Sequence, residues 1–571
     1  MPSSSPLESA WCAAPAVVRA EERVQLLTGR KRLEAHPDAG RSGEASGGTI
    51  SSTERRGLLA AVWGGCLLFL CGVTIADPDL WGHTLYGLRA IEQGVLVESS
   101  DPFSYTAAGA AWVNHEWLSE RLFAECWRRG GNAGMTALRN AFVVALFVVS
   151  WPTLRTRCSL PAAWILLVFT TECLANYVVF LRPQLATFVG VLATLSILRR
   201  QWERLSGALW LVPGGMVLWA NLHGGFLAGV AFVWLFAVAA VARSSLIPRR
   251  FGEAWKWLAA ATATALATLI NPYGLQLHRM LWNHLVTPQL VLEWQPVWAA
   301  APSAIYVVPF LLAGFAFGLS RRWERIDVLV LAAAAWQAAS HIRHVALFSL
   351  AVLALLAVPL SDAVSRLFPQ LHASWSLPGR RWWRWTAAVL ILVFLAVVHV
   401  RGVREIWNCG LRPWDIAVEA RAGVPGMPVA AVAEMRRRGL QGNLLTDYGW
   451  GQFILWHLWP DVRVAIDGRY RTVYPAEIEE ALIALQTAAS SDAERTPLLD
   501  DFPTDLVLAP VGGSLESYLK RRSGWTETYR DEQAVVYVPR QPGLAQSLGD
   551  RPAAAATPPK WVRFPGLDVP R

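Results

Sequence analysis

The sequence has few charged residues and lacks the motifs of several protein classes. Only 17% of its 571 residues are Asp, Glu, Lys or Arg, against roughly 25% in soluble globular chains. It contains no GxxxxGK[ST] loop, no GxSxG and no dinucleotide fingerprint, and residues 115–119 (HEWLS) lack the second histidine of HExxH. These absences leave an ATP-driven pump and a zinc protease without support. The seven cysteines form no CxxC pair and no metal-ligand spacing, which excludes a disulfide scaffold and predicts no metal site.

Apolar sequence is what the chain has in abundance. Residues of the AVILMFWYC set make up 54% of it, and a single soluble core stops growing at roughly 250–300 residues. We therefore expect a polytopic α-helical membrane protein. Eleven apolar runs are long enough to be considered as spans, and predict about eleven transmembrane helices. They cover residues 58–76, 135–153, 161–180, 184–198, 207–222, 225–242, 257–272, 303–319, 326–340, 345–360 and 385–400.

Basic residues alternate between the loops that join these runs. With a cytoplasmic N-terminus, the short inner loops carry sixteen Lys or Arg and the short outer loops carry three, Arg182, Arg279 and Arg343. This asymmetry follows the positive-inside rule and fixes the expected orientation in the membrane, with the N-terminus cytoplasmic and the C-terminal part extracytoplasmic. The net charge of +9 is then explained by contact with anionic lipid at the inner face, so we expect no nucleic-acid partner.

Composition divides the chain into four parts. We expect a disordered cytoplasmic tail at 1–55, a transmembrane domain at 56–410 with a long first outer loop at 77–134, an extracytoplasmic α/β domain at 411–540, and a loose Pro/Ala-rich tail at 541–571. In the α/β domain, strands expected at 443–447, 462–467, 505–509 and 534–538 alternate with helices expected at 450–458, 476–490 and 514–522.

Polar residues away from the inner loops collect on the outer side. Asp77 and Asp79 follow the first apolar run directly, and an aspartate before a helix can also be a simple N-cap. Carboxylates can take a proton from a hydroxyl, and arginine can bind a phosphate with two hydrogen bonds. We expect a reaction site at this lipid–water boundary. Its candidate catalytic residues are Asp77, Asp79 and Glu116, and its candidate substrate-binding residues are His83, Arg182, Asn221, His223, Glu293, Arg343 and His344.

Two further charged residues, Arg139 and Glu172, lie within the second and third apolar runs. An unpaired charge at this depth is costly, so we expect them to form a structural ion pair.

Several strings resemble one family of bacterial membrane proteins. Residues 77–83 (DPDLWGH), 101–106 (DPFSYT) and 112–118 (WVNHEWL) resemble the first outer loop of GT-C-type glycosyltransferases, the superfamily of protein O-mannosyltransferases and lipid A aminoarabinose transferases. Residues 182–183, 219–224, 271–274 and 293–294 are similar to other recurring strings of that group, and 448–451 through 466–469 to its C-terminal extension. The resemblance covers roughly residues 57–410.

The resemblance implies a GT-C-like fold and a reaction. Such enzymes transfer a sugar from a polyprenyl-phosphate donor to an acceptor on the non-cytoplasmic side, with a first-loop carboxylate as base. By position, Asp77 would be the base, Asp79 would complete the acidic pair, and Arg182 or Arg343 would hold the lipid phosphate. No cofactor is expected, and the glycan, lipid or protein acceptor stays open.

Two other functions remain open at this point. A transporter of a lipid-linked saccharide would place polar groups near the bilayer midplane, between internal repeats. A non-catalytic membrane scaffold would leave the acidic residues dispersed in space. The superficial polar cluster and the absence of a visible repeat favour the glycosyltransferase.

Overall fold

The computed structural model describes residues 50–286, 292–299, 304–370, 381–408, 414–417, 426–486, 496–540 and 561–566. The tail expected at 1–55 lies outside these residues up to position 49. Its last part is helical, because α2 (Ser52–Cys71) begins there, with the Ser51 hydroxyl accepting a hydrogen bond from Glu54 N at 3.1 Å.

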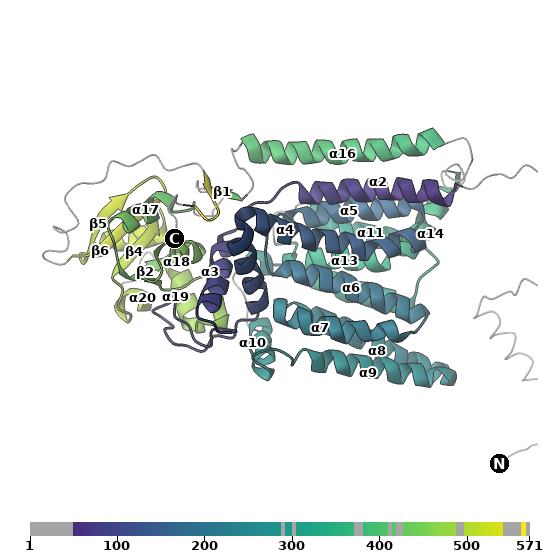
Figure 1. The fold of residues 1–571 in the computed structure, drawn as a ribbon, viewed down its shortest axis with the longest axis horizontal. Helices are drawn as coiled ribbons and strands as arrows, with labels where there is room; N and C mark the ends of the chain where they lie inside the picture. Colours follow the sequence, from purple (N-terminus) through teal and green to yellow (C-terminus); the bar gives the residue numbers. More distant parts are fainter. Residues whose placement is uncertain are drawn as a thin grey trace, which may run out of the picture. The chain divides into compact units, whose positions relative to one another are not determined.

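A bundle of apolar helices forms one part of the structure (Figure 1). Each of the eleven apolar runs overlaps at least one of these helices, and the run at 345–360 is divided between two of them. The bundle comprises α2, α4 (Trp117–Arg157), α5 (Leu160–Val178), α6 (Gln184–Glu203), α7 (Leu211–Leu222), α8 (Phe226–Leu246), α9 (Phe251–Ala267), α11 (Ala304–Leu319), α12 (Arg325–Ser340), α13 (Val345–Leu355), α14 (Ala357–Leu367) and α16 (Arg381–Asn408). Short 3-10 turns, η1 (Gly207–Trp210) and η2 (Pro248–Arg250), precede α7 and α9.

Length and apolarity single out fewer spans than the sequence suggested. Among the described residues, four helices are long and apolar enough to cross a bilayer, or five if α13 and α14, which meet at 72°, count as one bent span. Several other bundle helices are shorter, such as α9 with 17 residues and α12 with 16. The chain is a multi-pass membrane protein, and the expected count of about eleven is not reached by this criterion.

The basic turns meet at one end of the bundle. Arg55, near the start of α2, donates to Arg155 O at 2.7 Å and Cys158 O at 2.5 Å, which lie where α4 ends. Glu203, the last residue of α6, pairs with Arg157 and Arg199. In Figure 1 this end of α2, α4 and α6 lies opposite α3 and the sheet. The arginine-rich turns therefore lie together, as positive-inside sorting requires.

The expected ion pair between Arg139 and Glu172 is not formed. Arg139 Nε donates to the carbonyl oxygen of Val178 at 2.7 Å, and its Nη1 donates to Asn140 Oδ1 at 2.8 Å. Val178 is the last residue of α5, whose terminal carbonyls have no partner within the helix. The guanidinium therefore satisfies a helix end rather than a carboxylate.

The first outer loop contains its own helix. After Asp77, α3 (Pro78–Glu92) packs against the first part of α4, which is separated from the spanning part by non-helical backbone at Gly131 (φ +50°). The two helices approach so closely at Gly87 that a Cβ there would lie 2.1 Å from Glu120 O. This contact fixes the Glu116–Glu120 turn against α3.

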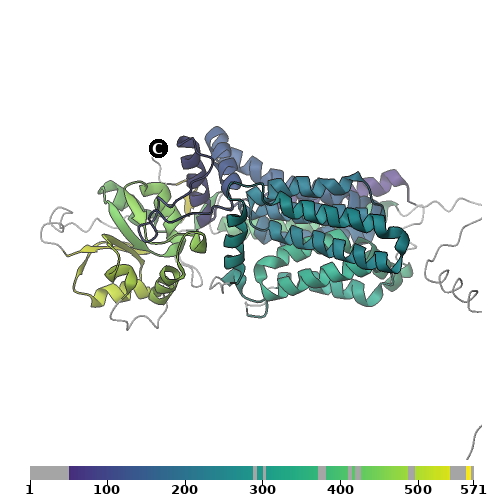
Figure 2. The same ribbon diagram turned by 90° about the horizontal axis from the view of Figure 1, so that it is seen from below.

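The C-terminal region contains a five-stranded mixed sheet with order β3-β2-β4-β6-β5, set apart from the helical bundle in Figure 2. Strands β2 (Gly442–Thr446), β3 (Val462–Val464) and β4 (Leu506–Pro510) are parallel, and β6 (Ala534–Pro539) and β5 (Trp525–Arg530) are antiparallel. Its helices are α17 (Val429–Arg437), α18 (Tyr448–Leu458), α19 (Ala476–Gln486), α20 (Pro497–Asp500) and α21 (Ser514–Arg521). The four expected strands are present, so a C-terminal mixed α/β region is confirmed.

The first outer loop joins this sheet directly. Val464 of β3 donates from N to Phe103 O, and Tyr105 N donates to Val464 O, both at 3.2 Å. Beside this bridge, Arg469 donates to Asp101 Oδ1 and Asp467 Oδ2, each at 2.7 Å, in a fully buried group of charges. The rings around its guanidinium, at 4.8–5.8 Å, are Tyr86, Phe103, Trp112 and Tyr474.

Part of the tail expected to be loose is a strand. β7 (Trp561–Arg563) pairs with β1 (Asp415–Ala417), and Phe564 packs against the rings of Trp81, Trp127 and Trp456. Trp81 Nε1 donates to Pro565 O at 2.8 Å. Burial of this aromatic ring against α3, α4 and α18 explains why residues 561–566 are held in place. Residues 541–560 lie outside the described part.

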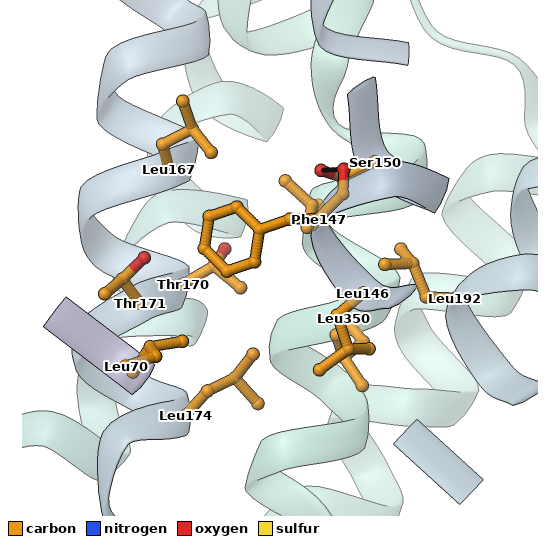
Figure 3. A pocket seen from close by; sticks show the side chains of 11 residues that line it. Leu70, Leu146, Phe147, Ser150, Leu167, Thr170, Thr171, Leu174, Leu192 and Leu350 are labelled. Carbon is orange, nitrogen blue, oxygen red and sulfur yellow. Dashed lines mark hydrogen bonds between the residues drawn. The ribbon is translucent and has the colours of Figure 1, made fainter. Parts of the chain in front are cut away.

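A small void of about 20 Å³ lies inside the bundle between α2, α4, α5, α6 and α13 (Figure 3). Leucine side chains line most of it, and the Ser150 hydroxyl beside it donates to Phe147 O at 2.8 Å. No titratable side chain lines it. It is therefore a packing void rather than a reaction site.

The buried Arg469 network predicts a large effect on stability. In Arg469→Met, Asp101 and Asp467 would lose their common partner inside the protein, which costs about 3–5 kcal/mol. Thermal unfolding of the purified protein should show a clearly lower Tm. Arg437→Gln is the matched control, because Arg437 is 66% exposed and solvent screens its pair with Glu434. Equal Tm values for the two variants would contradict this role.

Candidate active site

An ion pair between Asp77 and Arg182 lies at the end of the bundle opposite the basic turns. Ile75 and Phe180 form a parallel β-bridge, and Asp77 and Arg182 each lie two residues further along. Side chains two residues apart in extended backbone share a face, so this bridge aligns the pair. Arg182 donates to Asp77 Oδ2 from Nε at 2.7 Å and also from Nη2. Asp77 Oδ1 accepts from Asp79 N at 2.9 Å and so caps α3.

Asp79 lies beside this pair but is more accessible. Its side chain is 38% exposed, whereas that of Asp77 is 4% exposed. Arg182 Nη2 lies 3.4 Å from Asp79 Oδ2. Burial and the negative charge of Asp77 outweigh Arg182 and raise the pKa of Asp79 to about 6. The two acids therefore differ: Asp77 is buried and hydrogen-bonded through both oxygens, whereas Asp79 is partly exposed and has a raised pKa.

Glu293 and Arg343 complete the charged part of the site. Glu293, in the turn η3 (Leu292–Trp294), has its Oε1 3.7 Å from Arg182 Nη1. Arg343, in η4 (Ile342–His344), lies over the ring of Trp294 at 4.6 Å. Within the described residues no carboxylate reaches ion-pair distance of Arg343. His344 also contacts Trp294, with ring centroids 6.2 Å apart, and burial and Arg343 lower the pKa of His344 to about 4.

A histidine–carboxylate cluster adjoins these residues. Glu116 Oε1 lies 3.6 Å from His223 Nε2 and 3.7 Å from His115 Nε2, and Glu116 Oε2 lies 3.9 Å from His83 Nδ1. Glu120 accepts from Asn114 Nδ2 at 2.5 Å and lies 3.1 Å from His83 Nδ1. Burial lowers the pKa of His83, but the bond to Glu120 and the charges of both glutamates raise it to about 9.

Ligand atoms of His83, Glu116 and Glu120 lie within 4.8 Å of one another, which is close enough for one metal ion. However, Glu120 already shares its oxygens with His83 and Asn114. With His83 protonated, the three side chains form an internally paired cluster.

Two of the candidate residues have clear structural partners. His223 Nδ1 accepts from Gly225 N at 2.9 Å and lies 2.8 Å from the Thr187 hydroxyl, so its proton is carried on Nε2 and faces Glu116. Asn221 accepts from Trp117 Nε1 at 3.0 Å and donates to Ile270 O at 2.8 Å. Asn221 therefore ties the start of α4 to the ends of α7 and α9, and no described contact directs it toward the acidic pair.

The structure brings most candidate residues into two groups that are close enough to influence one another electrostatically. Asp77, Asp79 and Glu293 surround Arg182, and Glu116 links His83 to His223. Arg343 and His344 join through Trp294, next to Glu293. The sequence prediction did not include Gln452 and Gly468 of the C-terminal region, which lie against Asp79. Both fall within or beside the strings at 448–451 and 466–469, which were the only available signal.

Comparison with known proteins shows a likeness of fold. No family model and no curated protein matches the chain. ArnT from Cupriavidus metallidurans, solved bound to undecaprenyl phosphate, is 12% identical and similar over 86% of this chain and 98% of its own, with a TM-score of 0.43. An Archaeoglobus fulgidus oligosaccharyltransferase, in complex with Zn and sulfate, is 14% identical over 84% of this chain and 73% of its own, with a TM-score of 0.42.

The arabinofuranosyltransferase AftD from Mycobacteria is 16% identical to this chain, with a TM-score of 0.44. The match covers 87% of this chain and 40% of AftD. The chain is thus structurally similar over most of its length to GT-C glycosyltransferases, as its sequence strings indicated. This similarity concerns the fold. The roles of the residues follow from the contacts described above.

The two aspartates are expected to differ in their effect on stability. Asp77→Asn removes the charge that Arg182 pairs with, and should reduce the free energy of unfolding by about 2–3 kcal/mol. Asp79→Asn changes a side chain that is partly exposed, and should alter the free energy by about 0.5 kcal/mol or less. Thermal unfolding of both purified variants measures the difference. A larger loss in Asp79→Asn would show that the roles are reversed.

Proposed function

We propose that this protein is a GT-C-type glycosyltransferase of the bacterial inner membrane. It transfers a sugar from a polyprenyl-phosphate donor to an acceptor hydroxyl on the extracytoplasmic side, with a first-loop aspartate as general base. The observation that carries the proposal is the arrangement of Asp79, an accessible carboxylate with a raised pKa, in the same group as Arg343, a guanidinium without a carboxylate partner among the described residues.

Hydrogen bonding favours Asp79 over Asp77 as the base. Asp77 Oδ2 accepts two hydrogen bonds from Arg182 and Oδ1 caps α3, so taking up a proton there would break buried contacts. Asp79 has a carboxylate that is 38% exposed and a pKa of about 6. A base is most effective when its pKa is near the working pH. The role first expected for Asp77 is therefore assigned in this proposal to Asp79.

Arg343 is better placed than Arg182 to bind the donor phosphate. The guanidinium of Arg182 is surrounded by Asp77, Asp79 and Glu293. That of Arg343 lies on Trp294 and keeps its hydrogen-bond donors free of carboxylates in the described structure. A planar guanidinium can donate two parallel hydrogen bonds to a phosphate. Arg182 in turn supplies the positive charge that offsets the negative charges of Asp77 and Asp79.

The proposed step is a single displacement. The acceptor oxygen attacks the anomeric carbon of the sugar, and the bond between that carbon and the phosphate oxygen breaks. The acceptor proton passes to the carboxylate of Asp79, and the lipid phosphate leaves with the electron pair, its negative charge stabilised by Arg343. The anomeric configuration is inverted. The His83–Glu116–His223 cluster lies beside the reacting groups and supplies fixed charge and hydrogen bonding.

Asp79→Asn should lower sugar transfer about 10²–10⁴-fold, because the amide cannot accept the proton. In the wild type, kcat/KM should rise with pH through the pKa of Asp79 near 6, since only the ionised acid is a base. Membranes are assayed with a panel of radiolabelled polyprenyl-phosphate sugars.

The matched control is Glu98→Gln, which alters another first-loop acid, paired with Arg89, and should leave transfer unchanged. Wild-type turnover by Asp79→Asn would exclude Asp79 as the base. A flat pH profile between 5 and 8 would also contradict the assignment.

A further inference from the structure

Gln452 of the C-terminal region reaches the acidic pair from outside the membrane bundle. It lies on α18 with 3% of its surface exposed. With its amide nitrogen facing α3, Nε2 lies 3.0 Å from Asp79 Oδ1 and 3.1 Å from Asp79 O, and donates to these oxygens. Arg182 lies on the other carboxylate oxygen, 3.4 Å from Oδ2. Each oxygen of Asp79 therefore has a different partner, one from each part of the chain.

From this geometry we propose that Gln452 is a positioning residue that holds the Asp79 carboxylate in its reactive orientation. The inference rests on the proposed function, which makes Asp79 the base. With this role for Gln452, the C-terminal α/β region takes part in the reaction and does more than cover the site.

Two glycines keep the space that this contact needs. A Cβ at Gly82 would lie 2.5 Å from Cδ of Gln452. A Cβ at Gly468 would lie 2.7 Å from Asp79 Oδ1 and 3.2 Å from Cδ of Gln452. Neither glycine has a positive φ, so backbone conformation does not require glycine at these positions. Close approach of the Gln452 amide to Asp79 explains both.

The elements on either side of Gln452 are firmly anchored. Asp447 caps α18 by accepting from Gly449 N at 2.9 Å. Gly468 stands between Asp467 and Arg469, which belong to the buried charge network with Asp101. The amide is therefore held by fixed backbone on both sides, which limits the positions that Asp79 can take.

A neutral donor suits a base better than a cation would. An amide orients the carboxylate by hydrogen bonds, whereas a second positive charge would strongly lower its proton affinity. The other titratable and charged groups around Asp79 are Asp77, His83, Glu116, Arg182, Tyr448 and Tyr470. Among these groups Gln452 adds orientation without adding charge.

The test follows the titration of Asp79 itself in the full-length protein, purified into lipid nanodiscs. pH-dependent infrared difference spectra report the protonated carboxyl band, which is assigned to Asp79 by its loss in Asp79→Asn. Gln452→Leu removes a donor to the ionised form, so the midpoint should rise by about 1 pH unit, the equivalent of one charge-assisted hydrogen bond. Gln486→Leu is the matched control, because Gln486 donates to a different carboxylate, Asp447 Oδ2, at 2.8 Å. An unchanged midpoint in Gln452→Leu would overturn the proposal.

Gly468→Ala provides an independent variant if Gln452→Leu does not fold. A methyl group at this position would lie 2.7 Å from Asp79 Oδ1, which is too close. The carboxylate would have to move away from Gln452, so the midpoint of the Asp79 titration should also shift. An unshifted midpoint in a folded Gly468→Ala protein would contradict the inferred contact.

Sugar transfer separates this inference from the function it rests on. One outcome in Gln452→Leu is that the acid limb of the pH profile of kcat/KM moves together with the infrared midpoint of Asp79, while kcat falls by a larger factor than KM rises. That result supports both the positioning role of Gln452 and the role of Asp79 as the base. If the infrared midpoint moves and the acid limb does not, Gln452 still positions Asp79, but Asp79 is not the base.

Discussion

The pairing of Asp77 with Arg182 is the interaction on which the site depends. Two carboxylates at positions 77 and 79 would repel each other if both were charged in a partly buried setting. Arg182 resolves this by binding Asp77 with two hydrogen bonds, while Asp77 keeps its second oxygen for the start of α3. Asp79 then remains accessible with a raised pKa. One arginine therefore turns two neighbouring acids into a structural residue and a reactive one.

This pair is also where three parts of the chain meet. The backbone of the segment that follows α2 forms a hydrogen bond to residue 179, which precedes Arg182 in the chain. The same segment also forms backbone hydrogen bonds to residues 414–415, where β1 begins and pairs with β7. The first outer loop joins the C-terminal sheet through Val464 and the buried Arg469 network. The site is consequently built from the membrane bundle and the α/β region together, and neither part holds all of its groups.

Much of the architecture could be predicted from the sequence because it follows from simple patterns. Apolar runs become helices, since a backbone in a low-dielectric medium must satisfy its own hydrogen bonds. Short runs such as 443–447 and 505–509 become strands of the sheet, and their apolar side chains are buried there. β5 escaped prediction because its residues 525–530 (WTETYR) form an edge strand that is polar and half-exposed.

The details of the site depend on contacts between distant residues, which no local pattern contains. Asp77 and Asp79 look alike in sequence, and their difference comes from Arg182, more than a hundred positions away. Glu172 and Arg139 were expected to pair because both lie in the outer halves of apolar runs. In the structure Arg139 instead donates to the carbonyl oxygen of Val178 at the end of α5. Gln452 shows no feature of its own in the sequence, and only its packing between Gly82 and Gly468 reveals it.

The central claim is that the reactive side chains lie on the side of the membrane opposite the arginine-rich turns. Single cysteines at two exposed positions, Glu92 in the first loop and Arg321 in a basic turn, would test it most directly in a cysteine-free background. In intact cells, a membrane-impermeant thiol reagent with access to the outer face should label Glu92→Cys, and Arg321→Cys only after the membrane is opened. Labelling of both cysteines from the same side, or the reverse pattern, would contradict the account.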